Sequence, residues 1–207
     1  MSMWWDLSLQ ALIFLVSIAA YLWTNNIPQK LFTQYHSYRN RHKHQARRHF
    51  VRAAEHLSSS QPSSAVTEAD AAIQLDPTDA ASHILKAVAL EVQGFNTSAL
   101  DSLNVALSPL AVKSLEVEEK ADAMAKRAQL RMAVAPNDQE VWRVAEKELR
   151  EVVELKKESV RAWCLLGKCC EGIGKNEAAK EAYEEAVRIA PNSAPAKEGL
   201  QRLEGDN

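Results

Sequence analysis

Glycine and proline, the residues that most often interrupt helices, are scarce in this sequence. Among 207 residues there are only six glycines and seven prolines, and no stretch alternates apolar and polar residues in the manner of a β-strand. Alanine, glutamate, leucine and lysine are abundant instead, and all four favour helices. The sequence therefore predicts an all-α protein.

Motifs that carry catalysis are missing as well. The sequence has no glycine-rich phosphate-binding loop, no serine-centred nucleophile elbow and no His-Glu metal-binding helix. Five histidines fall between residues 36 and 56, but thiolate co-ligands and, apart from Glu55, acidic co-ligands are absent from that stretch. We expect no enzymatic activity, no cofactor and no metal site.

Only three cysteines are present, Cys164, Cys169 and Cys170, and all fall in one predicted helix. Neighbours in a helix point to different sides, so no disulfide framework is indicated. An ammonium group beside the vicinal pair, that of Lys168, lowers the pKa of a thiol. A reactive thiol is therefore the alternative to packing in the core.

One apolar stretch stands out near the N-terminus. The seventeen residues 7–23 carry no charge, and a helix of that length spans about 26 Å, close to the thickness of a bilayer core. Aromatic side chains, which favour membrane interfaces, stand at both ends: Trp4, Trp5, Tyr21 and Trp23. We predict a transmembrane signal-anchor helix over residues 4–24, with Leu7, Leu15 and Trp23 in the membrane. A cleaved secretory signal and a buried helix are the alternatives.

Cations follow the apolar stretch, whereas none precedes it. Residues 1–60 hold seven basic and two acidic side chains, and residues 25–45 form a basic juxtamembrane segment. Cationic flanks stay on the cytoplasmic side, which predicts an integral single-pass protein with a cytosolic C-terminus, in the endoplasmic reticulum or in a mitochondrial or plastid outer membrane. The residues predicted to set topology or touch lipid are Arg39, Arg41, Lys43, Arg47 and Arg48. A solvated helix face is the alternative, and nucleic acid is not an expected partner.

Residues 160–193 carry the pattern of a helix-turn-helix repeat. Large and small side chains recur there at helical spacing, so that large ones on one helix enter holes on its neighbour: Trp163, Leu166, Gly167, Ala179, Tyr183 and Ala186. Gly174 separates the two helices, and Pro191 ends the second. The pattern resembles the tetratricopeptide repeat, whose period is about 34 residues. Cys170 stands at the position where that family usually has tyrosine, which predicts a local gap or an altered groove wall.

Weaker copies of this pattern lie upstream. A single repeat of this kind cannot bury its apolar face, so at least three are expected. The resemblance implies a tetratricopeptide-like α-solenoid with these segments: repeats at 46–79, 80–113, 118–159 and 160–193, and a capping helix at 194–204, within a domain of residues 46–205. The third repeat fits only with about eight extra residues, near AVAPNDQE, which would lengthen its internal turn.

The resemblance implies a binding module with a protein or peptide in its groove. Many such domains hold the acidic C-terminal tail of heat-shock chaperones in a carboxylate clamp of Lys, Asn and Arg side chains. The corresponding positions here are Phe50, Ala54, Leu85, Glu119 and Ala123, so clamp binding is disfavoured. In a register one repeat onward, Arg161 alone matches. We predict a membrane-anchored adaptor, with a receptor or accessory factor in protein import at an organelle outer membrane as the alternative.

Overall fold

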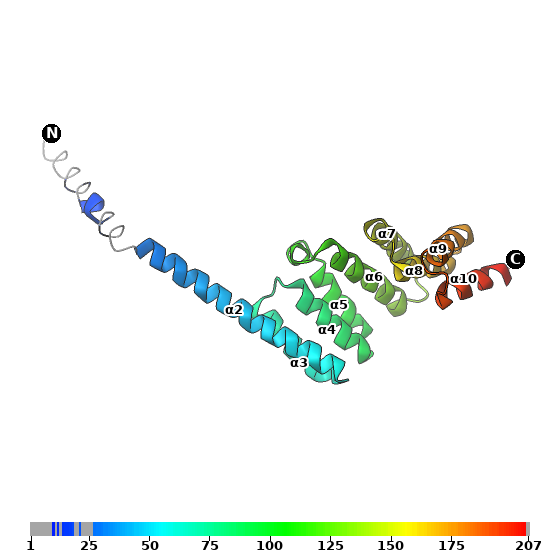
Figure 1. Cartoon of the computed structure of the whole chain (residues 1–207), viewed down its shortest axis with the longest axis horizontal. Coiled ribbons are helices and arrows are strands. Elements are labelled where there is room, and N and C mark those ends of the chain that lie inside the picture. Colours follow the sequence, from blue (N-terminus) through cyan, green and yellow to red (C-terminus); the bar gives the residue numbers. More distant parts are fainter. Residues whose placement is uncertain (1–9, 11, 13, 19–20, 22–26, 206–207) are drawn as a thin grey trace. The chain divides into compact units, whose positions relative to one another are not determined.

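The computed structural model describes residues 10, 12, 14–18, 21 and 27–205. Within these residues every regular element is a helix, which confirms the predicted all-α class (Figure 1). The α-helices are α2 (Ile27–Ser58), α3 (Pro62–Leu75), α4 (Ala80–Val92), α5 (Asn96–Ala106), α6 (Val117–Val134), α7 (Gln139–Leu155), α8 (Val160–Gly172), α9 (Asn176–Ile189) and α10 (Ala194–Gly205), with a short 3-10 helix, η1 (Val112–Ser114). The chain divides into two compact units, Met1–Gln45 and Ala46–Asn207, and the packing described below lies within the second.

The prediction of an integral single-pass membrane protein is wrong. Among the described residues, no helix is both long enough and apolar enough to cross a bilayer. Of the residues predicted to lie in the membrane, Leu15 is 65% exposed in a helical stretch, whereas Leu7 and Trp23 lie outside the described residues. The apolar run has only seventeen residues, at the short end of the roughly 17 to 25 that a spanning helix needs. This marginal length is the reason that hydropathy misled the sequence prediction.

The role predicted for five cationic side chains, in setting topology or contacting lipid, stays a prediction. All five residues lie in α2, and the side chains of Arg41, Lys43, Arg47 and Arg48 are exposed. Exposed cations on a helix surface are solvated without any partner. The predicted cytosolic orientation and organelle location rested on the same helix and are therefore wrong with it.

The helices of the second unit pack in consecutive pairs. α4 packs on α5, α6 on α7 and α8 on α9, and α10 packs against α9 and α8 (Figure 1). The side chains of Asp79 and Ser159 cap the first turns of α4 and α8. After the same two helices, Gly94 and Gly174 have φ angles of 81° and 77°, which glycine adopts without strain. Matching caps and stops thus define a recurring helix-turn-helix unit.

The first pair joins the C-terminal part of α2 to α3. His49 on α2 lies 2.7 Å from Glu68 on α3, measured from Nδ1 to Oε2. Near the turn, His56 Nδ1 lies 2.9 Å from Gln61 Oε1. Two of the clustered histidines therefore connect neighbouring segments of the chain. Among the described residues, no three His, Cys, Asp or Glu side chains lie close enough together to hold a metal ion.

The third pair accommodates its extra residues in a way that the sequence prediction missed. The turn between α6 and α7 is short, since α6 ends at Val134 and α7 begins at Gln139. The helices themselves are longer, with 18 and 17 residues against 13 and 14 in α8 and α9. The prediction of a longer turn was therefore wrong. Asp138 caps α7 by accepting backbone N–H groups, so the helix begins at Gln139, three residues after Pro136.

The last pair, α8 and α9, contains the residues of the repeat pattern. Leu166, Gly167, Ala179, Tyr183 and Ala186 are all buried. Trp163 is half-buried, and its indole N–H donates to the carbonyl of Lys157 at 2.8 Å. Pro191 is exposed in the turn that follows α9. The large residues therefore fill the space between α8 and α9, and Pro191 lies where helix can no longer continue.

Tyr183 connects this pair to the capping helix. Its side chain is 1% exposed, and its ring lies between two glycines, Gly167 on α8 and Gly199 on α10. A Cβ atom would come within 2.6 Å of the ring at Gly167 and within 2.4 Å at Gly199. Such distances are well below van der Waals contact, so both positions require glycine for the ring to fit.

We expect Gly167→Ala and Gly199→Ala each to lower the free energy of unfolding by about 1 to 3 kcal/mol, because a methyl group would overlap the enclosed Tyr183 ring. Urea denaturation followed by circular dichroism measures the change. Gly205→Ala is the matched control, since no atom lies within 4 Å of a Cβ at that position. Wild-type stability in both buried variants would show that the ring is not held between these helices.

Candidate functional site

Side chains from the first helices of the pairs, joined at the C-terminal end by side chains from α7, α9 and α10, line two hollows. The N-terminal hollow has a volume of about 510 Å³ and is lined by Phe50, Ala81, Ile84, Leu85, Val88, Leu115, Glu119, Asp122, Ala123, Lys126 and Arg161. The C-terminal hollow has a volume of about 1150 Å³ and is lined by Gln129, Trp142, Val160, Arg161, Cys164, Leu165, Lys168, Glu171, Gly172, Tyr183, Ser193, Pro195, Glu198 and Arg202. Arg161 lines both. Volumes of this size accommodate several side chains of a partner.

The walls of the N-terminal hollow are mainly apolar. Phe50 comes from α2, Leu85 and Val88 from α4, and Ala123 from α6. Of the five positions compared with the carboxylate clamp, Phe50, Leu85, Glu119 and Ala123 line this hollow, while Ala54 does not. The positions that carry cations and amides in clamp domains therefore carry mostly hydrocarbon here.

Three charged side chains at the edge of the N-terminal hollow are engaged within the chain. Lys126 forms an ion pair with Glu91 on α4. Asp122 accepts hydrogen bonds of 2.8 and 2.9 Å from Lys156 Nζ. Glu119 Oε2 accepts the backbone N–H of Glu116 at 3.0 Å, closing a capping box at the start of α6. Apart from Arg161, the wall that remains available for a partner is apolar.

A polar network lies in the wall of the C-terminal hollow. Tyr183 Oη donates to Glu171 Oε2 at 2.9 Å, and Arg202 donates to both oxygens of Glu171 at 3.0 and 3.1 Å. The hydrogen bonds from Arg202 hold the pKa of Glu171 below its usual value although burial opposes them. Burial and the adjacent carboxylate raise the pKa of Tyr183 well above its usual range. Tyr183 therefore stays protonated, and Glu171 stays charged and bonded.

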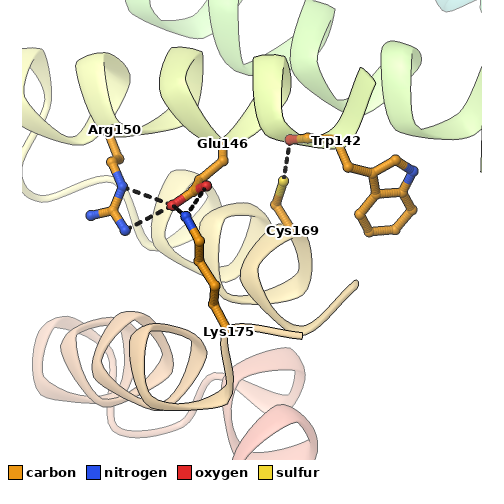
Figure 2. A network of polar contacts seen from close by, with 5 residues as sticks. All are labelled: Trp142, Glu146, Arg150, Cys169 and Lys175. Carbon is orange, nitrogen blue, oxygen red and sulfur yellow. Dashed lines mark hydrogen bonds and ion pairs between the residues drawn. The ribbon is translucent and has the colours of Figure 1, made fainter. Parts of the chain in front are cut away.

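Trp142 is a lining residue that the repeat pattern did not reveal. Its ring lies against α8, where a Cβ at Gly172 would come within 2.0 Å of the ring. Its indole N–H donates to the carbonyl of Ala135 at 3.1 Å, and its own carbonyl accepts the Cys169 thiol at 3.2 Å (Figure 2). The available signal was Gly172 itself. Gly172 is the last residue of α8 and has no positive φ angle, so backbone conformation does not require a glycine there and a packing reason is indicated.

A buried carboxylate connects α7 to the start of α9. Glu146 is 6% exposed and accepts hydrogen bonds from Lys175 Nζ at 2.7 and 3.0 Å (Figure 2). Arg150 adds two more, at 2.9 and 3.1 Å. Burial by itself would raise the pKa of Glu146, but the hydrogen bonds from Lys175 and Arg150 outweigh burial and lower the pKa. Glu146 is therefore ionised in the folded chain and holds the two helices together.

The vicinal cysteines are part of the core. Cys169 and Cys170 are fully buried, and burial together with the adjacent Cys170 thiol raises the pKa of Cys169 to about 12. Burial also raises the pKa of Cys170 and of Cys164, which lies in the wall of the C-terminal hollow. Protonated thiols are poor nucleophiles, and this favours packing over the reactive alternative. Because Cys170 is fully enclosed, it forms no part of a groove wall.

The stacked helix pairs, with their first helices lining shared hollows, define an all-α solenoid of the tetratricopeptide type. Residues 160–193, the same residues that the sequence pattern singled out, match the family model described as tetratricopeptide repeat. The repeat assignment therefore rests on this segment and on the fold that the whole second unit adopts.

Solved structures with the same fold include MamA of Desulfovibrio magneticus RS-1, which is 18% identical with a TM-score of 0.67, over 78% of this chain and 85% of that one. YrrB, described as a TPR protein with an unusual peptide-binding site, is 18% identical with a TM-score of 0.63, over 76% and 75%. PilF of Pseudomonas aeruginosa is 18% identical with a TM-score of 0.65, over 80% and 70%. No curated protein matches the sequence. At these identities the likeness concerns the fold alone.

We expect Glu146→Gln to lower the free energy of unfolding by about 1 to 3 kcal/mol at neutral pH, because an amide replaces a carboxylate that accepts from two cations. The pKa of Glu146 is lower in the folded than in the unfolded chain. Its contribution is therefore complete above the unfolded pKa, about 4.3, and disappears as the pH falls through the folded value. The difference between variant and wild type should shrink accordingly in urea denaturation at decreasing pH.

The matched control for this measurement is Glu140→Gln on the same helix. The side chain of Glu140 is 76% exposed, and its ion pair with Arg143 lies on the surface. Pairs of that kind contribute about 0 to 1 kcal/mol. Equal effects of the two substitutions at neutral pH would contradict the role of Glu146 in joining α7 to α9.

Proposed function

We propose that the repeats bind a protein or peptide partner on the face lined by their first helices, and that an apolar segment of the partner occupies the N-terminal hollow. A protein-interaction scaffold is the role that the repeat match and the shared fold support. The proposal of an apolar ligand rests on the difference between the apolar and the charged side chains of that hollow. Its walls are hydrocarbon from Phe50, Leu85 and Val88, while Lys126 and Asp122 are already paired within the chain. Burying apolar side chains there would stabilise a complex by about 25 cal/mol per Å².

The same positions argue against a chaperone tail as the partner. A carboxylate clamp holds a chain terminus with several charge-assisted hydrogen bonds. Phe50, Leu85 and Ala123 offer no donor, and the carboxylate of Glu119 would repel an acidic tail. The partner is therefore one whose main contribution is apolar.

We further infer that the protein is a binding protein and not an enzyme. Two titratable groups of the C-terminal hollow are held in states unsuited to proton transfer near neutral pH, since Glu171 is bonded to Arg202 and the thiol of Cys164 is protonated. The alternative role as an import receptor at an organelle outer membrane depended on the predicted membrane helix and loses its basis.

Selection from a random dodecapeptide library on the full-length protein should enrich apolar sequences. Val88→Asp should weaken binding of the selected peptides at least about tenfold, because a carboxylate would replace hydrocarbon in the hollow. Val144→Asp is the matched control, since Val144 is 52% exposed on α7 and lines neither hollow. Fluorescence anisotropy measures the affinities, and circular dichroism checks that both variants are folded. Equal affinities of wild type and Val88→Asp would place the binding surface elsewhere.

Isothermal titration with a chaperone C-terminal peptide should show no saturable binding to the full-length protein at micromolar concentrations. The physical reason is the loss of several charge-assisted hydrogen bonds, each worth about 1.5 to 3 kcal/mol. Micromolar binding that disappears when the terminal carboxylate of the peptide is amidated would contradict the proposal, because it would show that a clamp is present.

A further inference from the structure

The N-terminal stretch presents large apolar side chains that the described chain leaves mostly uncovered. The described residues between positions 10 and 21 are helical and exposed. The large aliphatic and phenyl side chains among them are 61%, 67%, 65%, 60% and 41% exposed, in the order Leu12, Phe14, Leu15, Val16 and Ile18. An exposed apolar patch larger than a few hundred Å² marks a site of interaction with a protein or a membrane.

The exposed apolar area is close to what a stable interface needs. At roughly 200 Å² for a fully exposed large apolar residue, these five residues expose on the order of 600 Å². A specific protein–protein interface buries about 800 Å² on each partner. The five residues therefore supply most of the area that association requires.

The stretch has no polar face. Because an α-helix has about 3.6 residues per turn, Leu12, Phe14 and Leu15 point to three different sides. Residues 11–22 read ALIFLVSIAAYL, and Ser17 is the one clearly polar residue among them. A helix that is apolar all round is covered on all sides in a stable protein. A groove covers one side, and an amphipathic helix satisfies it.

We propose that the N-terminal stretches of several copies of this chain pack against one another in a helix bundle, so that the protein is a homo-oligomer. Further copies of an uncharged, all-round apolar helix supply an apolar neighbour on each side. The N-terminal hollow covers one side only and does not meet this requirement. The inference goes beyond the proposed function, because it concerns a different part of the chain and does not depend on what the repeats bind.

The charges that follow the stretch limit the contact between copies. From Leu7 to Gln29 the sequence carries no charge. Cations follow on α2, where the side chains of Arg41 and Lys43 are exposed. Identical cations on neighbouring copies repel one another, which disfavours packing of α2 on α2. The contact is therefore confined to the uncharged stretch.

An oligomer of this kind makes the binding role proposed above multivalent. Each assembly carries one N-terminal hollow per copy, so a partner with repeated binding segments engages several hollows together. Such avidity exceeds the affinity of one site by roughly 100-fold to 10,000-fold where the geometry allows simultaneous binding. This consequence, unlike the bundle itself, rests on the proposed function.

Sedimentation velocity of the full-length protein at micromolar concentrations tests the bundle. The wild type should sediment as an oligomer. Leu15→Glu should weaken the association at least about tenfold, because a carboxylate would be buried among apolar side chains. Leu15→Met keeps the site apolar and should keep the oligomer. Val144→Glu is the matched control, since it places the same charge at an apolar residue that is 52% exposed on α7.

Disulfide cross-linking then locates the contact. The sequence has no cysteine before Cys164, so Val16→Cys places a first thiol in the stretch. Oxidation by diamide, which converts two thiols to one disulfide and is itself reduced to the hydrazine, should link copies of this variant. Val144→Cys, with a similarly exposed thiol, should stay unlinked at the same concentration.

A monomeric wild type, or an oligomer that Leu15→Glu leaves intact, would overturn the inference. Dissociation by Val88→Asp would also overturn it, because it would place the stretch of one copy in the N-terminal hollow of another. Monomeric protein that floats with phosphatidylcholine vesicles would do the same, with a bilayer covering the stretch. The proposed function is measured separately, since Leu15→Glu should bind the selected peptides with wild-type affinity.

Discussion

The aromatic ring of Tyr183, enclosed between glycines on α8 and α10, is the contact on which the C-terminal half of the fold depends. It lets three helices approach more closely than any side chain at Gly167 or Gly199 would allow. The hydroxyl at the edge of the same ring meets Glu171 and, through it, Arg202. One side chain thus fills the last repeat, holds the capping helix and places the polar wall of the C-terminal hollow.

Buried carboxylates hold α7 against its neighbouring helices, as Tyr183 holds α9. Glu148 pairs with Arg127 and Arg131 on α6, and Glu146 reaches Lys175 before α9. A buried acid without such partners would be strongly destabilising, so each of these contacts restricts the helices to one arrangement. The groove walls are consequently preformed, and a partner binds without first ordering them. A preformed surface loses less conformational entropy on binding, which favours affinity.

How far the sequence predicted the fold depended on the size of the core residues. The last repeat was recognisable because Trp163 and Tyr183 are large residues at characteristic positions. The first two repeats bury mainly alanine, and the larger side chains in their cores are Leu103 and, from α6, Leu130. Alanine is common on helices for reasons of propensity alone, so it marks a buried face poorly. The apolar N-terminal run led to a wrong prediction of a membrane protein for a related reason. Hydropathy counts apolar residues without testing whether a membrane-spanning helix forms.

The sequence by itself determined the helices, their stops at Gly94 and Gly174, and the packing code of the last repeat. These properties are local: capping, backbone conformation and helical spacing depend on residues within about four positions of one another. Only the tertiary structure decided which side chains line the groove. Trp142 and Arg161 lie on different helices, and both reach the C-terminal hollow because α7 and α8 pack together. The surroundings of a charged side chain also depend on residues distant in the chain. Arg161 donates to Gln129, which lies 32 positions earlier, so no local sequence pattern contains this contact.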